Sequence, residues 1–211
     1  FYLDAIKLTF QSCNLSATIL AEYQKKKMAA FWTQVKGLAN NYFGYNNLGV
    51  ASDRPYGGTG SSYADPSLAS FMGTLTYTLL NRYTLNLTTR ADGSSMVGKD
   101  HTWGFFPSIS ATWNIKKERF LRDNNTVSLM DLRTGYGQSG NLGGISSYLT
   151  LKQYIPVGLI SYNGTPTVTM GTLRNSNPDL RWETRSTFNI GADLGFFKNR
   201  LLLTAEYYYS K

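Results

Sequence analysis

The sequence predicts an all-β protein, an antiparallel up-and-down transmembrane β-barrel of which it contains about eight consecutive strands. Three observations predict this fold. Many segments alternate between apolar and polar residues, short and long connections follow each other in turn, and the polar positions are mostly Thr, Ser, Asn and Gly. Alternation gives a strand two different faces, because successive side chains point to opposite sides.

The composition agrees with a barrel and excludes some other classes. Only 16% of the 211 residues are charged, against roughly 25% in ordinary globular domains, and 14% are aromatic. No run of about 18 apolar residues is present, which excludes a transmembrane helix but not barrel strands. The net charge of +8 is scattered, with Lys25-Lys26-Lys27 as the only tight basic run. Since no nucleic-acid-binding motif is present, we expect no nucleic acid partner.

The first half of the chain contains four predicted strands. Residues 1–9 alternate poorly. In 15–24, 71–79 and 83–90 the apolar residues occupy odd positions, while Ser, Thr and Asn fill most of the even ones. A short turn at Asn81-Arg82 joins the last two segments, so we expect them to form a hairpin.

The second half contains four more. In 103–116 the stretch FFPSISATWNI places Phe, Ile and Trp on one side and Ser, Thr and Asn on the other. The segment 127–138 alternates in the same way, as do 187–196 and 201–208 on either side of a tight turn at Lys198-Asn199. Several of these strands are longer than the usual five or six residues.

The connections predict a sheet whose two ends differ. Short or moderate connections fall near 10–13, 81–82, 117–126 and 197–200, and long ones near 37–67, 93–102 and 139–181. Antiparallel strands place successive connections at opposite ends. One end therefore carries compact turns and the other large loops, as in outer-membrane barrels.

The apolar face is predicted to meet lipid. A soluble sandwich also alternates, but its outer face normally carries many Lys and Glu, which are scarce on the polar faces here. Trp103, Phe105, Trp113 and Phe196 lie near strand ends, as in the aromatic girdles of membrane barrels. Both chain ends read as mid-strand, so we expect an arc of a wider barrel. Two alternatives stay open, a complete small barrel with a structural or adhesive role and a soluble carbohydrate-binding β-sandwich.

A few charged residues fall on the predicted lumen face. They either contact a plug or substrate, or neutralise one another along a wet wall, and we favour neutralisation because a charge on the lipid face would cost about 2–4 kcal/mol. The residues are Arg90, Asp92, Asp131, Arg133, Asp193 and Glu206.

Other polar motifs do not indicate chemistry. Asp92, Asp100 and His101 lack metal-ligand spacing, and His101 has no nucleophile context, so we assign no catalytic, metal or cofactor-binding residue. Asn177-Pro178-Asp179 is typical of a turn. Substrate-binding residues are not assigned.

Two groups of loop residues have two interpretations each. Lys25-Lys26-Lys27 either contacts lipopolysaccharide phosphates or extends a strand into solvent, and we favour the latter. The loop aromatics either stack on sugars or on a partner, or pack the loops together, and we favour packing. They are Tyr42, Phe43, Tyr45, Tyr56, Tyr63, Tyr148, Tyr154 and Tyr162.

Four stretches in order resemble one known family. They are RADGSSMVGKDHTWGFFPSISATWNI (90–115), LMDLRTGYGQSGN (129–141), NPDLRWET (177–184) and FNIGADLGFFKNRLLLTAEYYYSK (188–211). Together they resemble the barrel of the SusC/RagA family of TonB-dependent outer-membrane transporters. The resemblance covers nearly the whole chain and is strongest from about 68 to 211.

The resemblance implies a fold and a function. Residues 1–211 would form part of a barrel of about 22 strands with a plugged lumen, in the outer membrane of a Gram-negative, Bacteroidetes-type cell. The family is not enzymatic and imports large nutrients such as glycans or peptides. Expected partners are outer-membrane lipid and lipopolysaccharide, a SusD-like surface lipoprotein, and the TonB complex, which would bind an N-terminal region outside this sequence.

Overall fold

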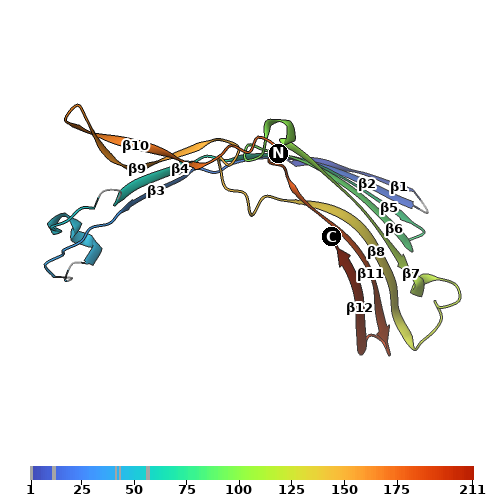
Figure 1. Cartoon of the computed structure of the whole chain (residues 1–211). Helices are drawn as coiled ribbons and strands as arrows, with labels where there is room; N and C mark the ends of the chain where they lie inside the picture. The colour runs from blue at the N-terminus through green and yellow to red at the C-terminus, as the bar shows by residue number, and fades with distance from the viewer. Residues whose placement is uncertain (1, 11–12, 41, 43, 56–57) are drawn as a thin grey trace.

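The chain forms a curved antiparallel sheet of eight strands, from which two hairpins project (Figure 1). The computed structural model describes every residue except 1, 11–12, 41, 43 and 56–57. The strands of the sheet lie side by side in chain order, as in an up-and-down wall. They are β1 (Tyr2–Phe10), β2 (Cys13–Lys25), β5 (Ser67–Leu79), β6 (Tyr83–Ser94), β7 (Trp103–Asn114), β8 (Val127–Asn141), β11 (Glu183–Phe196) and β12 (Leu201–Ser210). All eight predicted strands are confirmed, the poorly patterned first one included.

The long connections contain structure that the alternation did not predict. One holds the hairpin of β3 (Met28–Thr33) and β4 (Thr59–Ala64), with the short 3-10 segment η1 (Gly44–Val50) between them. The other holds the hairpin of β9 (Gln153–Tyr162) and β10 (Thr165–Arg174). Both extend away from the same end of the sheet (Figure 1). The difference between the two ends is therefore confirmed.

The opposite end of the sheet carries short connections. The β5–β6 turn places Leu80 and Asn81 at positive φ, and the β11–β12 turn does the same for Phe197, Lys198 and Asn199. Positive φ at consecutive residues gives the tight reversal that a hairpin of twisted strands requires. The longer β7–β8 connection begins with the 3-10 turn η3 (Ile115–Lys117).

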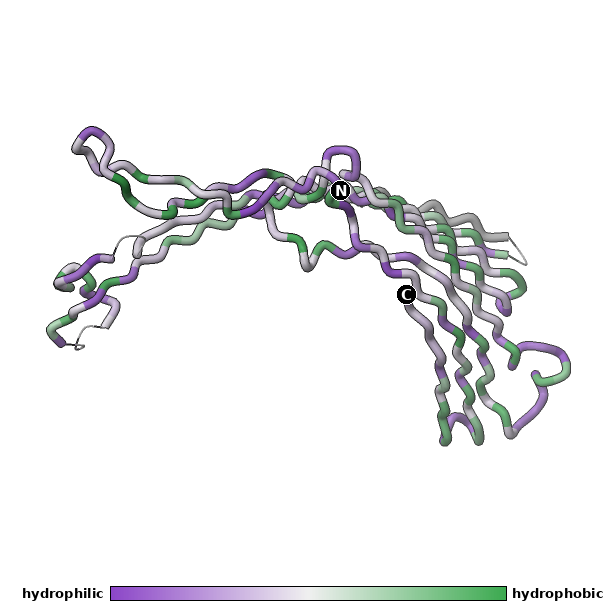
Figure 2. Tube along the Cα trace, viewed as in Figure 1, coloured by the Kyte–Doolittle hydropathy of each residue, from purple (hydrophilic) through white to green (hydrophobic). Residues whose placement is uncertain are grey.

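The sheet has two faces, and hydrophobic and hydrophilic residues alternate along its strands (Figure 2). Ile109, Trp113 and Leu203 are 46%, 37% and 54% exposed. Within the described residues only Val97 and Phe106 are buried hydrophobic side chains, and no second layer of polypeptide covers the apolar face. Soluble monomers rarely expose a contiguous apolar surface of this extent. The face therefore fits the hydrocarbon environment that its sequence predicts.

Two aromatic pairs lie at opposite ends of the apolar face. Near the long connections Phe71 stacks on Trp103 with ring centroids 5.9 Å apart, and near the short turns Tyr83 stacks on Trp113 at 6.2 Å. The two tryptophans are ten positions apart on β7, which is about 33 Å along a strand. At the tilt of roughly 40° usual in membrane barrels, the pairs stand about 25 Å apart, the usual height of the apolar band.

The sheet does not close on itself. In the described part of the chain, β1 pairs only with β2 and β12 only with β11, so two edges lack a neighbour. The interior strands are paired on both sides, with the β7–β8 pairing limited to Ser108–Asn114 against Asp131–Gly137. The structure is thus an open arc of antiparallel wall. No helix among the described residues has the length and apolar character needed to cross a membrane.

Glu118 connects the turns at the short-turn end. Its carboxylate accepts hydrogen bonds from the Tyr83 hydroxyl at 2.5 Å and the Trp113 indole N–H at 3.1 Å, and it pairs with Arg82 at 3.0 Å. The hydrogen bonds from Tyr83 and Trp113 are the main reason why the pKa of Glu118 lies below its ordinary value of 4.5. The carboxylate therefore ties the aromatic pair to the β7–β8 connection.

An arginine is expected to be far more costly on the apolar face than on the polar face. Leu87→Arg places a charge near the middle of the apolar band and is expected to lower the free energy of unfolding by about 2–4 kcal/mol. Thr88→Arg, one residue along β6 and on the other face, is the matched control with little loss. Denaturant unfolding of the full-length protein in lipid vesicles measures both. Equal losses for the two variants would contradict this assignment of the faces.

Glu118→Gln is expected to make stability less sensitive to acid. Because folding lowers the pKa of Glu118, its ionised form stabilises the fold above about pH 4.5, and this contribution is lost as the pH falls through the lowered pKa. Between pH 7 and pH 4 the wild-type full-length protein should lose more free energy of unfolding in urea than the variant. Asp123→Asn is the control, since its 3.5 Å pair with Arg122 is exposed. A variant that matches the wild type at both pH values would refute this role.

Candidate functional site

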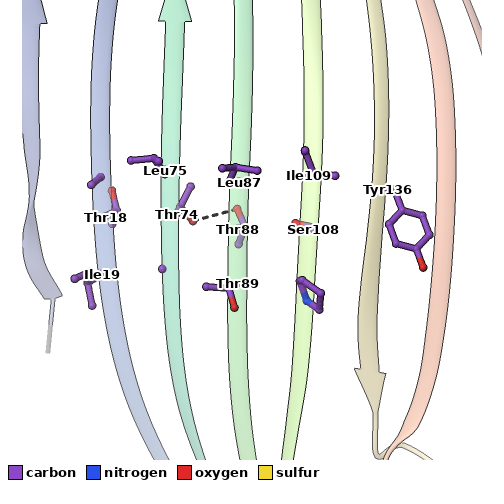
Figure 3. Close-up of a pocket in the computed structure, with 13 residues that line it drawn as sticks. Thr18, Ile19, Thr74, Leu75, Leu87, Thr88, Thr89, Ser108, Ile109 and Tyr136 are labelled. Atoms are coloured by element: carbon purple, nitrogen blue, oxygen red, sulfur yellow. Dashed lines mark hydrogen bonds between the residues drawn. The ribbon is translucent and has the colours of Figure 1, made fainter.

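The polar face is the candidate functional surface, and hydroxyl and amide groups form ladders across its strands. Three cross-strand pairs join β5 and β6, Thr74 with Thr88 at 3.2 Å, Thr76 with Asn86 at 2.8 Å, and Thr78 with Thr84 at 3.3 Å. Figure 3 shows the first of these between neighbouring strands. Asn86 continues the ladder to Ser110 of β7 at 3.4 Å. Such a surface offers many weak, uncharged hydrogen-bonding groups to water or to a polar solute.

Arg90 and Asp92 form a fixed pair on this face near the long connections. The Arg90 Nε–H lies 2.8 Å from both carboxylate oxygens of Asp92, and an Nη2–H donates to the Ser70 hydroxyl at 3.2 Å. Ser70 and Asp92 are buried. The two charges therefore satisfy each other, as the neutralisation hypothesis predicts.

A second charged group joins β8, β11 and β12. Arg133 Nε lies 2.7 Å from Asp193 Oδ2, and the Thr204 hydroxyl donates to Asp193 Oδ1 at 2.9 Å. Asp131 is the register partner of Asp193, and its Oδ1 is buried without a hydrogen bond from the described residues. Glu206 lies opposite Gly191 and is exposed. Neutralisation thus accounts for Arg133 and Asp193 but not for Asp131 and Glu206.

The segment 177–182 folds back over the polar face at the long-connection end. The Leu180 N–H donates to the Asn177 carbonyl at 3.3 Å, which confirms the predicted turn. Trp182 packs edge-on against Phe106 at 5.5 Å, and its indole N–H donates to the Thr102 carbonyl at 3.2 Å. The sequence reasoning missed this contact, although Phe106 interrupts the polar positions of β7 and so signalled a packing partner.

Gly98 allows this segment to approach. Its N–H donates to the Leu180 carbonyl at 2.7 Å. A Cβ at this position would lie 1.9 Å from the carbonyl oxygen of Pro178, which is backbone and cannot move aside as a flexible side chain could. The glycine is therefore required by the close contact between the β6–β7 connection and the segment before β11.

An apolar hollow lies on the opposite face. It has a volume of about 500 Å³, and Leu75, Leu87, Ile109 and Tyr136 enter it from four neighbouring strands (Figure 3). Its lining has almost no polar atoms at the surface. This hollow fits a hydrocarbon chain and not a polar solute, so we do not place the functional site there.

The loop residues singled out from the sequence lie at the long-connection end. Tyr45, Tyr63 and Tyr162 are exposed, as is Tyr42, while Phe43 and Tyr56 lie outside the described residues. Tyr148 donates to Asp65 at 3.3 Å, and the Lys152 ammonium lies 5.2 Å from the Tyr154 ring. Tyr148 and Tyr154 thus show interactions between loop residues of the kind that we favoured.

The remaining polar candidates lie in the same region. Lys25 pairs with Asp65 at 3.2 Å. Asp100 and His101 lie on η2 (Lys99–His101) in the β6–β7 connection. Among the residues that the structure describes, no three His, Cys, Asp or Glu side chains group as metal ligands.

The arrangement defines a class of protein, a β-barrel whose wall separates lipid from a polar lumen. The chain belongs to the family of TonB-dependent receptors, because the family model described as "TonB dependent receptor-like, beta-barrel" matches residues 8–211. The family predicted from the sequence motifs is thereby confirmed.

Named relatives support the same assignment. The chain is 35% identical over 191 residues to TonB-dependent receptor P26 of Formosa agariphila, covering 90% of this chain and 19% of that protein. It is 39% identical over 154 residues to TonB-dependent receptor SusC of Bacteroides thetaiotaomicron, covering 69% of this chain and 15% of SusC. The matched region therefore spans no more than a fifth of these relatives.

A solved structure shows the same fold. The structure of the RagAB peptide transporter matches with a TM-score of 0.82 over 98% of this chain and 22% of that chain, at 22% sequence identity. The open eight-stranded arc thus corresponds to a section of a much longer polypeptide.

The pairing of Arg133 with Asp193 is expected to be measurable in a double-mutant cycle. Arg133→Met, Asp193→Asn and the double variant of the full-length protein should give a coupling free energy of up to about 1 kcal/mol, because the pair is only partly exposed. The same cycle on Arg122 and Asp123, which are both exposed, should give almost none. Denaturant unfolding measures both cycles, and equal coupling in the two would refute a specific role for the lumen pair.

Proposed function

We propose that this chain forms wall and extracellular loops of a TonB-dependent outer-membrane transporter that imports large nutrients such as glycans or peptides. One observation carries the proposal. An exposed apolar face lies between two aromatic pairs about 25 Å apart, and the other face of the same strands is built from hydroxyl, amide and paired charged groups. This is the surface required between lipid and a water-filled passage.

The two ends of the sheet suggest how the wall is oriented. Outer-membrane barrels have long extracellular loops and short periplasmic turns. The hairpins β3–β4 and β9–β10 therefore extend into the medium, where they meet lipopolysaccharide, cargo and a SusD-like surface lipoprotein. Energy would come from the TonB complex through a region outside this sequence. The relatives named SusC and RagAB support this reading.

The polar wall suits transport and not catalysis. The threonine and asparagine side chains of the ladders already hydrogen-bond to one another across the strands, so they bind a passing glycan or peptide only weakly. Arg90 and Arg133 are held by carboxylates on the wall and do not form a strong anion site. Glu206 is exposed on the same wall and is a carboxylate open to a hydrogen bond from a plug or from cargo.

Both alternative functions have an observation against them. A complete small barrel of eight strands would pair β1 with β12, yet each of these has a single neighbour in the described chain. A soluble carbohydrate-binding sandwich would cover its apolar face with a second sheet, yet Ile109, Trp113 and Leu203 are exposed. A transporter wall agrees with both observations.

Uptake by cells tests the proposed function. The full-length gene is expressed with that of its surface lipoprotein in Gram-negative cells lacking other importers of this kind, and panels of fluorescent oligosaccharides and oligopeptides are offered. Accumulation of at least one panel member is expected, and a protonophore should abolish it because TonB-dependent transport uses the proton gradient. Uptake that continues unchanged with the protonophore, or none from either panel, would contradict the proposal.

A further inference from the structure

The short-turn end of the sheet concentrates positive charge. Its three described connections, residues 80–82, 115–126 and 197–200, contain seven Lys and Arg and two acidic residues, which leaves five positive charges of the net +8. The basic run at the other end differs, because Lys25 is paired with Asp65 at 3.2 Å. The short-turn end therefore differs from the rest of the chain in how closely its positive charges are spaced along the sequence.

Three of the seven cations stabilise the turns themselves. The Lys116 ammonium donates to the carbonyls of Leu121, Arg122 and Asn124 at 3.0, 3.1 and 2.6 Å. Lys117 donates to the Asn81 carbonyl at 2.8 Å, and Arg82 pairs with Glu118. These groups are satisfied within the protein and are not available to a ligand.

Four cations remain available. Arg119, Arg122, Lys198 and Arg200 are all exposed. Arg122 has a 3.5 Å contact with Asp123, in which both side chains are open to solvent. In the described structure the other three show no side-chain partner. The exposed ion pair between Arg122 and Asp123 is weak, so the Arg122 guanidinium is free to bind a stronger anion.

The fold places these four residues in two neighbouring connections at the short-turn end. Glu118 is bonded to both Tyr83 and Trp113, so Arg119 follows directly after the anchored residue. The Phe197 N–H donates to the Thr126 carbonyl at 2.8 Å, which brings the β11–β12 turn against the β7–β8 connection. Arg119 lies six positions after Trp113, and the β11–β12 turn lies beyond Leu132, the register partner of Trp113, toward the short-turn end. Both connections therefore lie beyond the apolar band, on the side of the headgroup layer, which is about 5–8 Å thick.

Exposed phenylalanines accompany the cations. Phe120 is 75% exposed and Phe197 58% exposed, each directly beside a basic residue. Large apolar rings next to arginine and lysine are typical of segments at a membrane interface, where the ring enters the acyl region and the cation meets the phosphate. In solvent alone, both rings would remain unfavourably exposed to water.

We propose that Arg119, Arg122, Lys198 and Arg200 form a binding surface for anionic phospholipid headgroups of the periplasmic leaflet, such as phosphatidylglycerol. The proposal rests on the proposed function, since it needs the barrel in a membrane with its short turns toward the periplasm. Guanidinium groups bind phosphate oxygens through two parallel hydrogen bonds, and three of the four residues are arginine. Phe120 and Phe197 would fix the depth of the turns.

Lipid retention by the full-length receptor in detergent, measured by native mass spectrometry, tests the surface. Phosphatidylglycerol and phosphatidylcholine are titrated separately against the wild type and two variants. The first is R119Q/R122Q/K198Q/R200Q. The second, K26Q/K27Q/K36Q/K99Q, removes as many charges from the long-loop end. The wild type is expected to prefer phosphatidylglycerol, and the first variant to bind it at least about ten-fold more weakly, since each cation contributes roughly five-fold. Phosphatidylcholine binding should not change.

The remaining outcomes separate this surface from the proposed function. Folding is checked first by heat-modifiable migration, so that a misfolded variant is replaced by R119Q/R200Q, which alters fewer turn residues. If the first variant binds phosphatidylglycerol as the wild type does, or the second loses as much affinity as the first, the surface is refuted while the barrel stands. If the wild-type receptor is soluble without detergent and retains neither lipid, both proposals are overturned.

Discussion

The structure depends on one constraint, that a backbone N–H or C=O group facing hydrocarbon must find its partner within the protein. Strands satisfy it only through neighbours, so the interior strands from β2 to β11 are bonded on both sides. Pairing in turn imposes a period of two on the side chains and so produces the apolar and polar faces. The edges at β1 and β12 are where the same requirement calls for further strands.

The alternation predicted the sheet because lipid and lumen impose opposite demands on neighbouring residues. The alternation did not predict the hairpins β3–β4 and β9–β10, because the contrast between lipid and lumen is absent at these segments. In β9 the register shifts at Val157, and apolar residues occupy even positions (Tyr154, Ile160) as well as odd ones (Ile155, Val157, Leu159), so no apolar face is set apart by alternation. Beyond the membrane no single solvent selects a face, and only the pairing with β10 forms the strand. Periodicity therefore predicts structure only where two environments differ.

The sequence predicted which residues lie on the candidate functional surface, but not which of them contact one another. The alternation of side chains along each strand placed Arg90, Asp92 and Arg133 on the polar face. Arg90 and Asp92 are two positions apart on one strand and therefore share a face, where they can pair. The pair of Arg133 with Asp193 depends on the register of β8 against β11, which turn chemistry did not reveal. The contact of Phe106 with Trp182 crosses 76 positions of sequence and depends on how a long connection returns. Such contacts depend on the tertiary structure and not on the local sequence pattern.

The central claim is that lipid solvates the apolar face, and tryptophan quenching by lipids brominated along their acyl chains tests it most directly. In full-length receptors that retain only one tryptophan, the account predicts strong quenching of Trp103 and Trp113, which lie on the apolar face. Trp182, which packs on Phe106 over the polar face, should be quenched little. Quenching of Trp182 equal to that of the other two, or none of Trp103 and Trp113, would contradict the account.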